Sequence, residues 1–157
     1  MNFTHVYETY ANSVYAFLKL RLRDPFLIED IFQETFLAVY RQMAELDDIR
    51  HPKAWILTIA HRKMVDHLRK TSREISDDPL AGAAERSEDP DYSDLFAGEM
   101  LGLLDPVSRM IVYGIYIEGL TCKEMTDVLG IPEGTVKSRC YHARAKLKER
   151  LGREWRV

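Results

Sequence analysis

Residues 118–151 read EGLTCKEMTDVLGIPEGTVKSRCYHARAKLKERL, and this stretch decides the fold of the C-terminal half. Thr121 and Glu124 have the spacing of a capping box, in which each side chain satisfies a free backbone amide at the start of a helix. Gly130 ends that helix after Leu129, because glycine adopts the left-handed conformation at which helices stop. A longer, basic helix follows the turn. This order predicts a helix-turn-helix, a common DNA-binding motif.

The last helix has two distinct faces. Apolar residues at 136, 140, 143, 147 and 151 form one stripe, which we expect to be buried. The opposite face and its edges suit a DNA major groove, because small and polar side chains allow close approach while basic ones bind phosphates. The alternative is a solvated surface helix, which a basic run alone would favour. The candidate DNA contacts are Thr135, Lys137, Ser138, Arg139, Tyr141, His142, Arg144 and Lys146.

Upstream of this motif the sequence predicts one more helix and a linker. Asp105-Pro106 is a cap residue followed by proline at the first helical position, and the helix it opens should end at Gly119. An apolar lead-in covers residues 95–104. The segment 76–93, SDDPLAGAAERSEDPDYS, contains few large apolar groups, so we expect a flexible acidic linker. Residues 76–99 contain 8 acids and 1 Lys or Arg.

The N-terminal part shows helical periodicity and none of the alternation typical of strands. We expect three main helices: one over about Phe3–Leu22, one opening at Asp24-Pro25, and one from His51-Pro52 to about Arg69. The sequence therefore predicts an all-α protein of two small domains, residues 1–75 and 94–157, joined by the linker 76–93. A helical bundle is expected in the first domain and the helix-turn-helix in the second.

Two further helix faces are candidate binding surfaces. The third helix places Arg62 and Arg69 on one stripe near Trp55, which could stack on an unpaired base while guanidinium groups hold the backbone. A core tryptophan among solvated arginines fits the periodicity equally well. The second helix combines Glu29, Asp30, Gln33 and Glu34 with Phe32 and Phe36. That face could bind a basic protein partner, or it could be an ordinary solvated face beside a core.

Composition excludes several classes of function. The net charge of −3 argues against a generally basic coat, although residues 61–73 and 137–156 are locally basic. The two cysteines indicate neither a disulfide framework nor a zinc site. No motif of a catalytic or phosphate-binding site occurs, so we expect no enzyme activity, metal or cofactor. The absence of a long apolar run or an apolar leader favours a soluble, cytoplasmic protein without membrane insertion.

Three segments together resemble the extracytoplasmic-function (ECF) group of bacterial sigma factors. They are IEDIFQETFLAVYR (28–41), HPKAWILTIAHRKMVDHLRK (51–70) and the stretch 118–151. The resemblance covers nearly the whole chain and implies a sigma-2 domain followed by a sigma-4 domain. Such a protein binds core RNA polymerase through the β′ and β subunits and directs it to the −10 and −35 elements of promoter DNA. An anti-sigma factor, often membrane-anchored in this family, is a further implied partner.

The resemblance also implies roles for individual residues. The polymerase-binding helix is matched by Asp30, Gln33, Glu34, Thr35 and Phe36. The segment that captures the −10 element is matched by residues 51–70, with Trp55, Arg62, Lys63, Asp66, Arg69 and Lys70 as the candidate contacts. The −35 reading helix is matched by residues 133–148, which contain the candidate DNA contacts given above.

Two positions depart from the family pattern, and one alternative function stays open. Arg62 stands where the pattern I-A-x-N often has asparagine, and His142 stands where many relatives have arginine. These departures leave the reading of both promoter elements open. A free-standing helix-turn-helix regulator is the competing hypothesis, but its N-terminal half should be a ligand-binding or dimerisation domain.

Overall fold

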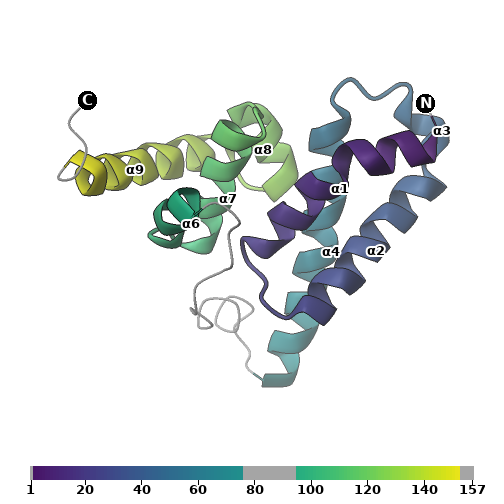
Figure 1. Cartoon of the computed structure of the whole chain (residues 1–157), viewed down its shortest axis with the longest axis horizontal. Coiled ribbons are helices and arrows are strands. Elements are labelled where there is room, and N and C mark those ends of the chain that lie inside the picture. Colours follow the sequence, from purple (N-terminus) through teal and green to yellow (C-terminus); the bar gives the residue numbers. More distant parts are fainter. Residues whose placement is uncertain (1, 76–94, 153–157) are drawn as a thin grey trace. The chain divides into compact units, whose positions relative to one another are not determined.

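The computed structural model describes residues 2–75 and 95–152, and it describes the side chains of 2–71 and 99–150. Within these ranges all regular structure is helical and no residue lies in a strand. The chain divides into two compact units, Met1–Pro90 and Asp91–Val157, whose helices are labelled in Figure 1. The all-α prediction is confirmed. The predicted linker 76–93 lies outside the described residues.

The first unit is built from α1 (Phe3–Lys19), α2 (Pro25–Arg41), the short α3 (Met43–Leu46) and α4 (Pro52–Ile75). Side chains cap the first two helices: Asn2 accepts from the amide of His5, and Asp24 accepts from the amide of Phe26. Helices α1, α2 and α4 pack against one another in pairs, as the ribbon shows (Figure 1). Their core includes Val6, Phe17, Ile31, Leu57 and Met64.

Three features of this unit differ from the sequence prediction. Helix α1 ends at Lys19, although Leu20 and Leu22 beyond it are still buried. Helix α3 was not predicted, because four residues are too few to show a periodicity. Helix α4 continues to Ile75, past the predicted end near Arg69.

The second unit contains α6 (Leu95–Gly102), α7 (Pro106–Val112), η1 (Tyr113–Ile117), α8 (Cys122–Leu129) and α9 (Glu133–Gly152). Both hydrogen bonds of the predicted capping box are present, between Thr121 and Glu124. Gly130 follows α8 with φ 68°, the left-handed conformation that the sequence predicted for this turn. Helices α7 and α8 both pack on α9. The helix-turn-helix prediction is confirmed in its local geometry.

The helix predicted from Asp105-Pro106 to Gly119 is not one continuous α-helix. After Val112 it widens into a π-helix, η1, and Gly119 turns the chain with φ 75°. Gly114 lies within η1 directly against the end of the Met125 side chain of α8, so a side chain at position 114 would require Met125 to move. Single π-turns of this kind are frequent at functional sites. Here η1 is in contact with α8, the first helix of the motif.

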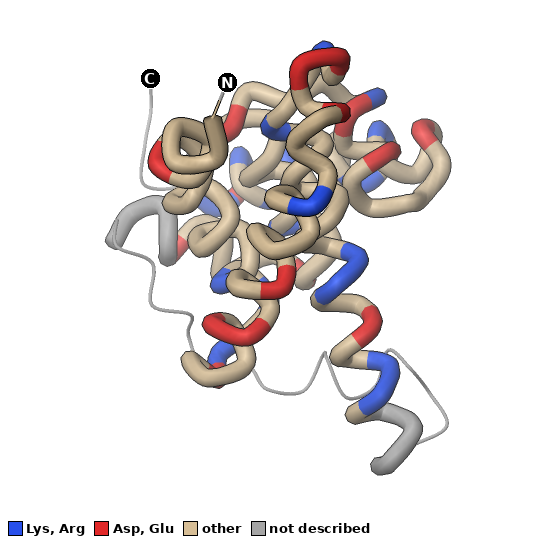
Figure 2. The backbone as a smooth tube through the Cα atoms, turned by 90° about the vertical axis from the view of Figure 1, so that its right-hand side faces the viewer, with Lys and Arg blue, Asp and Glu red and all other residues tan. Residues whose placement is uncertain are grey.

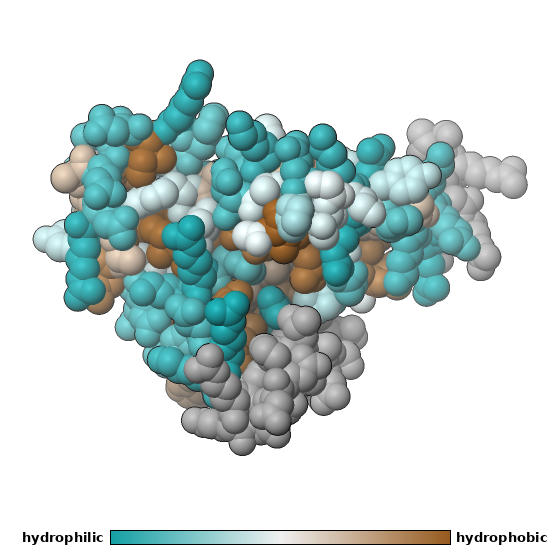
Figure 3. All heavy atoms as spheres, turned by 180° about the vertical axis from the view of Figure 1, so that it is seen from behind, coloured by the Kyte–Doolittle hydropathy of each residue, from teal (hydrophilic) through white to brown (hydrophobic). Residues whose placement is uncertain are grey.

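The face of the molecule drawn in Figure 3 is mostly polar where it is described. In the space-filling view of Figure 3, apolar side chains reach the surface in small areas separated by polar ones. None of the described helices is both long enough and apolar enough to cross a membrane.

Candidate protein- and nucleic-acid-binding surfaces

The outward face of α2 is a mixed apolar and polar stripe. Its members recur every three or four residues along the helix and are all exposed: Phe26, Asp30, Gln33, Leu37 and Tyr40. We call this set the α2 outer stripe. The ring of Phe26 is 81% exposed, although phenylalanine is usually buried. An exposed apolar set of this kind, interrupted by a carboxylate and an amide, is typical of a protein-binding surface.

Two of the five predicted polymerase contacts lie in the core. Thr35 is fully buried, and its hydroxyl donates to the carbonyl oxygen of Ile31 at 2.7 Å. The ring of Phe36 is also buried and packs against Phe3 and Tyr7. Both side chains therefore pack in the core beneath α2 and are not part of its exposed face. The other three predicted residues, Asp30, Gln33 and Glu34, are exposed.

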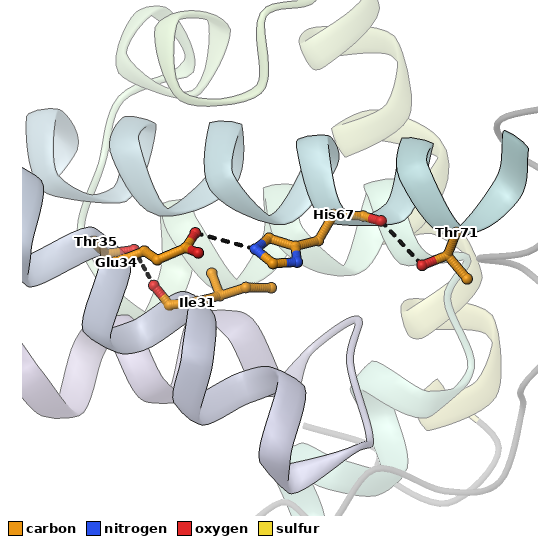
Figure 4. Close-up of polar contacts among 5 residues, drawn as sticks. All are labelled: Ile31, Glu34, Thr35, His67 and Thr71. Carbon is orange, nitrogen blue, oxygen red and sulfur yellow. Dashed lines mark hydrogen bonds and ion pairs between the residues drawn. The ribbon is translucent and has the colours of Figure 1, made fainter. Parts of the chain in front are cut away.

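Glu34 joins α2 to α4. Its carboxylate lies 3.1 Å from Nε2 of His67, which comes from the middle of α4 (Figure 4). The carbonyl oxygen of His67 in turn accepts a hydrogen bond from Thr71 at 3.1 Å. Glu34 is thus at the α4 edge of α2, beside the outer stripe.

The candidate −10 contacts on α4 differ in exposure. Arg62, Asp66, Arg69 and Lys70 are exposed, and Trp55 and Lys63 are half-buried. Figure 2 shows basic positions on both sides of a single acidic one toward the end of α4. Ile59, one helical turn after Trp55, is buried. The ring of Trp55 is therefore partly in contact with its own unit and partly accessible.

His61 marks the edge of α4 that packs on α1. Its ring lies 6.4 Å from that of Phe17, measured between centroids. Burial, together with the nearby charge of Arg21, lowers the pKa of His61 to about 4. Burial also lowers the pKa of Arg21, whose Nε has no hydrogen-bond partner in the described structure. His61 is therefore neutral at pH 7. The positive surface of α4 is formed instead by its exposed basic residues, which include Arg62 and Arg69.

Helix α9 has the two faces that the sequence predicted. Val136, Cys140, Ala143 and Leu147 are buried. Of the candidate DNA contacts, Thr135 is half-buried and the other seven are exposed: Lys137, Ser138, Arg139, Tyr141, His142, Arg144 and Lys146. The exposed face is basic and has small residues along it. Its composition fits a helix that enters the major groove.

Several side chains at the edges of α9 contact other residues of the same unit. Lys137 pairs with Glu133 at 3.3 Å, one helical turn earlier. The guanidinium of Arg144 lies 6.0 Å from the centre of the Tyr116 ring in η1. Arg139 donates to the carboxylate of Asp105 at 3.0 Å. Sequence periodicity could place these residues on a face of α9, but it gave no sign of their partners on other elements.

Comparison with known proteins identifies the family. Sigma-70 region 2 matches residues 6–74, and Sigma-70, region 4 matches residues 97–147. The chain is 30% identical over 155 residues to the ECF RNA polymerase sigma factor SigM of Bacillus subtilis (strain 168), covering 94% of each chain. The chain belongs to the ECF RNA polymerase sigma factors. SigK of Mycobacterium sp. (strain JLS), also an ECF sigma factor, is 30% identical over 162 residues and is covered to 83% of its length.

Two solved structures share the fold. The sigma factor RpoE from Bartonella quintana, solved with the anti-sigma factor NepR, superposes with a TM-score of 0.72 at 24% identity, covering 96% of each chain. CnrH, solved with the cytosolic domain of CnrY, gives a TM-score of 0.61 at 25% identity and covers 98% of this chain and 89% of CnrH.

The family fixes the class of activity. An ECF sigma factor directs promoter-specific transcription initiation by RNA polymerase and is an initiation factor rather than an enzyme. The match to region 2 also decides against a free-standing regulator, because the N-terminal half is a sigma domain. The predicted family and function are confirmed. Which residues contact polymerase and DNA stays a prediction.

Proposed function

We propose that three helix surfaces divide the work of initiation, and that the first is the polymerase-binding surface on α2. It consists of the α2 outer stripe together with Glu34, and its partner is the β′ subunit of core polymerase. The support is the exposure of Asp30 and Gln33 between large apolar side chains. Desolvated aromatic groups supply most of the binding energy in protein interfaces, and polar groups supply the register. Thr35 and Phe36 act indirectly by holding α2 in place.

The second surface is the exposed side of α4, which we assign to the −10 element. Trp55 offers a partly accessible ring for an unpaired base. The cationic groups along the helix would neutralise the phosphates of the opened strand. The proposed contacts are Trp55, Arg62, Lys63, Asp66, Arg69 and Lys70.

The third surface is the exposed face of α9, which we assign to the −35 element. The observation that carries this proposal is the separation of α9 into a buried apolar stripe and an exposed basic face within a capped helix-turn-helix. Ser138 and His142 are proposed to read bases, and Arg144 and Lys146 to hold phosphates. Thr135, Lys137 and Tyr141 complete the face. The second unit would also meet the β subunit, as the resemblance implies.

An anti-sigma factor is the remaining proposed partner. RpoE, which shares the fold, was solved in complex with an anti-sigma factor, and CnrH with a cytosolic domain of another protein. A partner that covers the α2 outer stripe would block polymerase binding directly. A membrane-anchored partner would hold the sigma factor at the cytoplasmic side of the membrane. The proposed location of the protein is the cytoplasm, where RNA polymerase and DNA are found.

The test of this division is DNA binding with and without core polymerase. The isolated chain should bind promoter duplex weakly, because its DNA surfaces are on two small units that must be held at the right separation. Core polymerase should make the binding specific. Tight, sequence-specific binding by the isolated chain, unaffected by polymerase in a gel shift, would contradict the proposal.

A further inference from the structure

The carboxylate of Asp105 has two roles at the start of α7. It is the N-cap of that helix and accepts a hydrogen bond from the amide of Ser108 at 3.2 Å. The same oxygen accepts from Nη1 of Arg139 on α9 at 3.0 Å. One side chain therefore caps α7 and also binds Arg139 of α9, 34 residues further along the sequence.

The Asp105 carboxylate is held in place by its surroundings. The guanidinium of Arg109 donates to the carbonyl oxygens of Leu101 and Leu104, both at 2.9 Å. These two residues precede Asp105, so the hydrogen bonds stabilise the turn between α6 and α7. Burial by itself would raise the pKa of Asp105, but hydrogen bonds from Ser108 and the charge of Arg139 lower it below the ordinary value. The carboxylate is thus a fixed, charged anchor at pH 7.

Arg139 lies at the α7 edge of α9. Successive helical residues are rotated by about 100°, so Arg139 is turned about 100° away from Ser138, which is at the centre of the exposed face. Helices α7 and α9 are in direct contact. The guanidinium of Arg139 pairs with Asp105, the N-cap of α7. The direction of this side chain is toward the protein rather than toward a groove.

We propose that Asp105 and Arg139 form a positioning pair for −35 recognition. The pair fixes the rotation of α9 about its own axis against α7, so that Ser138 and His142 meet base edges. Arg139 then acts through Asp105 and is not a phosphate contact, in contrast to the role expected from the basic run. The inference rests on the proposed function of α9 as the reading helix.

Substitutions at Asp105 can separate its two roles. Serine is as good an N-cap as aspartate but its hydroxyl is too short to reach α9, so Asp105→Ser keeps the cap and removes the grip on Arg139. Asp105→Asn keeps both the cap and an oxygen acceptor for Arg139. Arg139→Gln removes the other partner. Lys146→Gln is the matched loss of a basic side chain on α9 that is proposed to contact phosphate.

The experiment uses the full-length chain in holoenzyme and measures binding to a library of −35 sequences and its dependence on salt. Asp105→Ser and Arg139→Gln should each lower selectivity on the order of threefold, as expected for an exposed ion pair. The double variant should be no worse than either, and Asp105→Asn should retain most of the selectivity. Arg139→Gln should leave the salt slope unchanged, whereas Lys146→Gln lowers it by about one unit.

Two results overturn the proposal. One is a lower salt slope for Arg139→Gln, which would make Arg139 a phosphate contact. The other is unchanged selectivity for Asp105→Ser while circular dichroism shows a native fold. If wild-type holoenzyme prefers no −35 sequence at all, it is the assignment of α9 as the reading helix that fails.

Discussion

The carboxylate of Glu34 lies 3.1 Å from Nε2 of His67, and this contact joins the proposed polymerase-binding helix α2 to the proposed −10 helix α4. Both side chains are partly exposed, and the α2 outer stripe and the basic side of α4 lie on either side of the pair. If polymerase binding moves α2, the movement would be transmitted through this contact to His67 on α4. The contact links the two helices that carry the proposed surfaces of the sigma-2 unit.

The energy of this contact can be isolated with a double-mutant cycle. Glu34→Ala and His67→Ala should show a coupling free energy of about 0.5–1.5 kcal/mol in urea unfolding, the range for a hydrogen bond, because the contact is an ion pair only when His67 is protonated. Glu29→Ala serves as the control, because Glu29 lies on the other edge of α2 and should be additive with His67→Ala. Zero coupling between Glu34 and His67 at low salt would show that the pair has no energetic weight.

The α2 outer stripe should decide polymerase affinity without affecting folding. Asp30→Arg or Gln33→Ala should lose assembly with core polymerase, measured by size-exclusion chromatography, while circular dichroism stays native. Exposed substitutions change stability by only about 0.5 kcal/mol. Glu8→Arg, a matched charge reversal at an exposed position of α1, should assemble normally. Normal assembly of both α2 variants would mean that polymerase binds elsewhere.

The half-buried His61 should make the first unit less stable in mild acid. Its pKa is about 4 in the folded chain against 6.5 as the ordinary value, so the unfolded chain binds more protons between these pH values. The free energy of unfolding should therefore fall as the pH is lowered, by about 2 kcal/mol from pH 7 to pH 5. The His61→Gln variant should lack this part of the loss.

The measurement is urea unfolding at the two pH values, followed by the fluorescence of Trp55 in a Trp155→Phe background. This background leaves a single tryptophan, within the first unit, so the signal is not mixed with that of the second. An equal loss of stability in the wild type and in His61→Gln would show that His61 does not titrate in this window.

The reading face of α9 predicts different effects for two neighbouring basic positions. His142→Ala should change base preference over a −35 library, because a base contact discriminates by about 1–3 kcal/mol. Arg144→Ala should weaken all sequences alike and lower the salt slope by about one unit. If Arg144→Ala changes base preference and His142→Ala lowers only overall affinity, the orientation of α9 proposed above is wrong.

Local signals in the sequence predicted the capped helix starts and the end of α8, because these depend on residues close together in the chain. The Thr121–Glu124 capping box and the left-handed Gly130 are examples. The ends of α1 and α4 were predicted wrongly. The buried stripe of α9 was also predictable, since its helical spacing is regular. The family resemblance, in contrast, grouped Thr35 and Phe36 with the surface residues of α2, because a resemblance transfers positions without showing which of them are buried.

Features that depend on tertiary packing were not predictable. The contacts Glu34–His67 and Asp105–Arg139 each join residues more than thirty positions apart, so no local pattern indicates them. Gly114 in the π-helix η1 lies against Met125 of α8, and a contact between two helices cannot be read from local sequence. The spacing of Phe26, Asp30, Gln33 and Leu37 was a usable signal for the α2 outer stripe, but only their exposure separates it from a core stripe.

We propose that this chain directs core RNA polymerase to a specific set of promoters through its α2, α4 and α9 surfaces. Run-off transcription with purified core polymerase on genomic DNA fragments of the source organism, followed by sequencing of transcript ends, tests this most directly. We expect discrete start sites only when the chain is present, with shared sequences near −10 and −35, and we expect Asp30→Arg to abolish them. Start sites that are the same with and without the chain would contradict it.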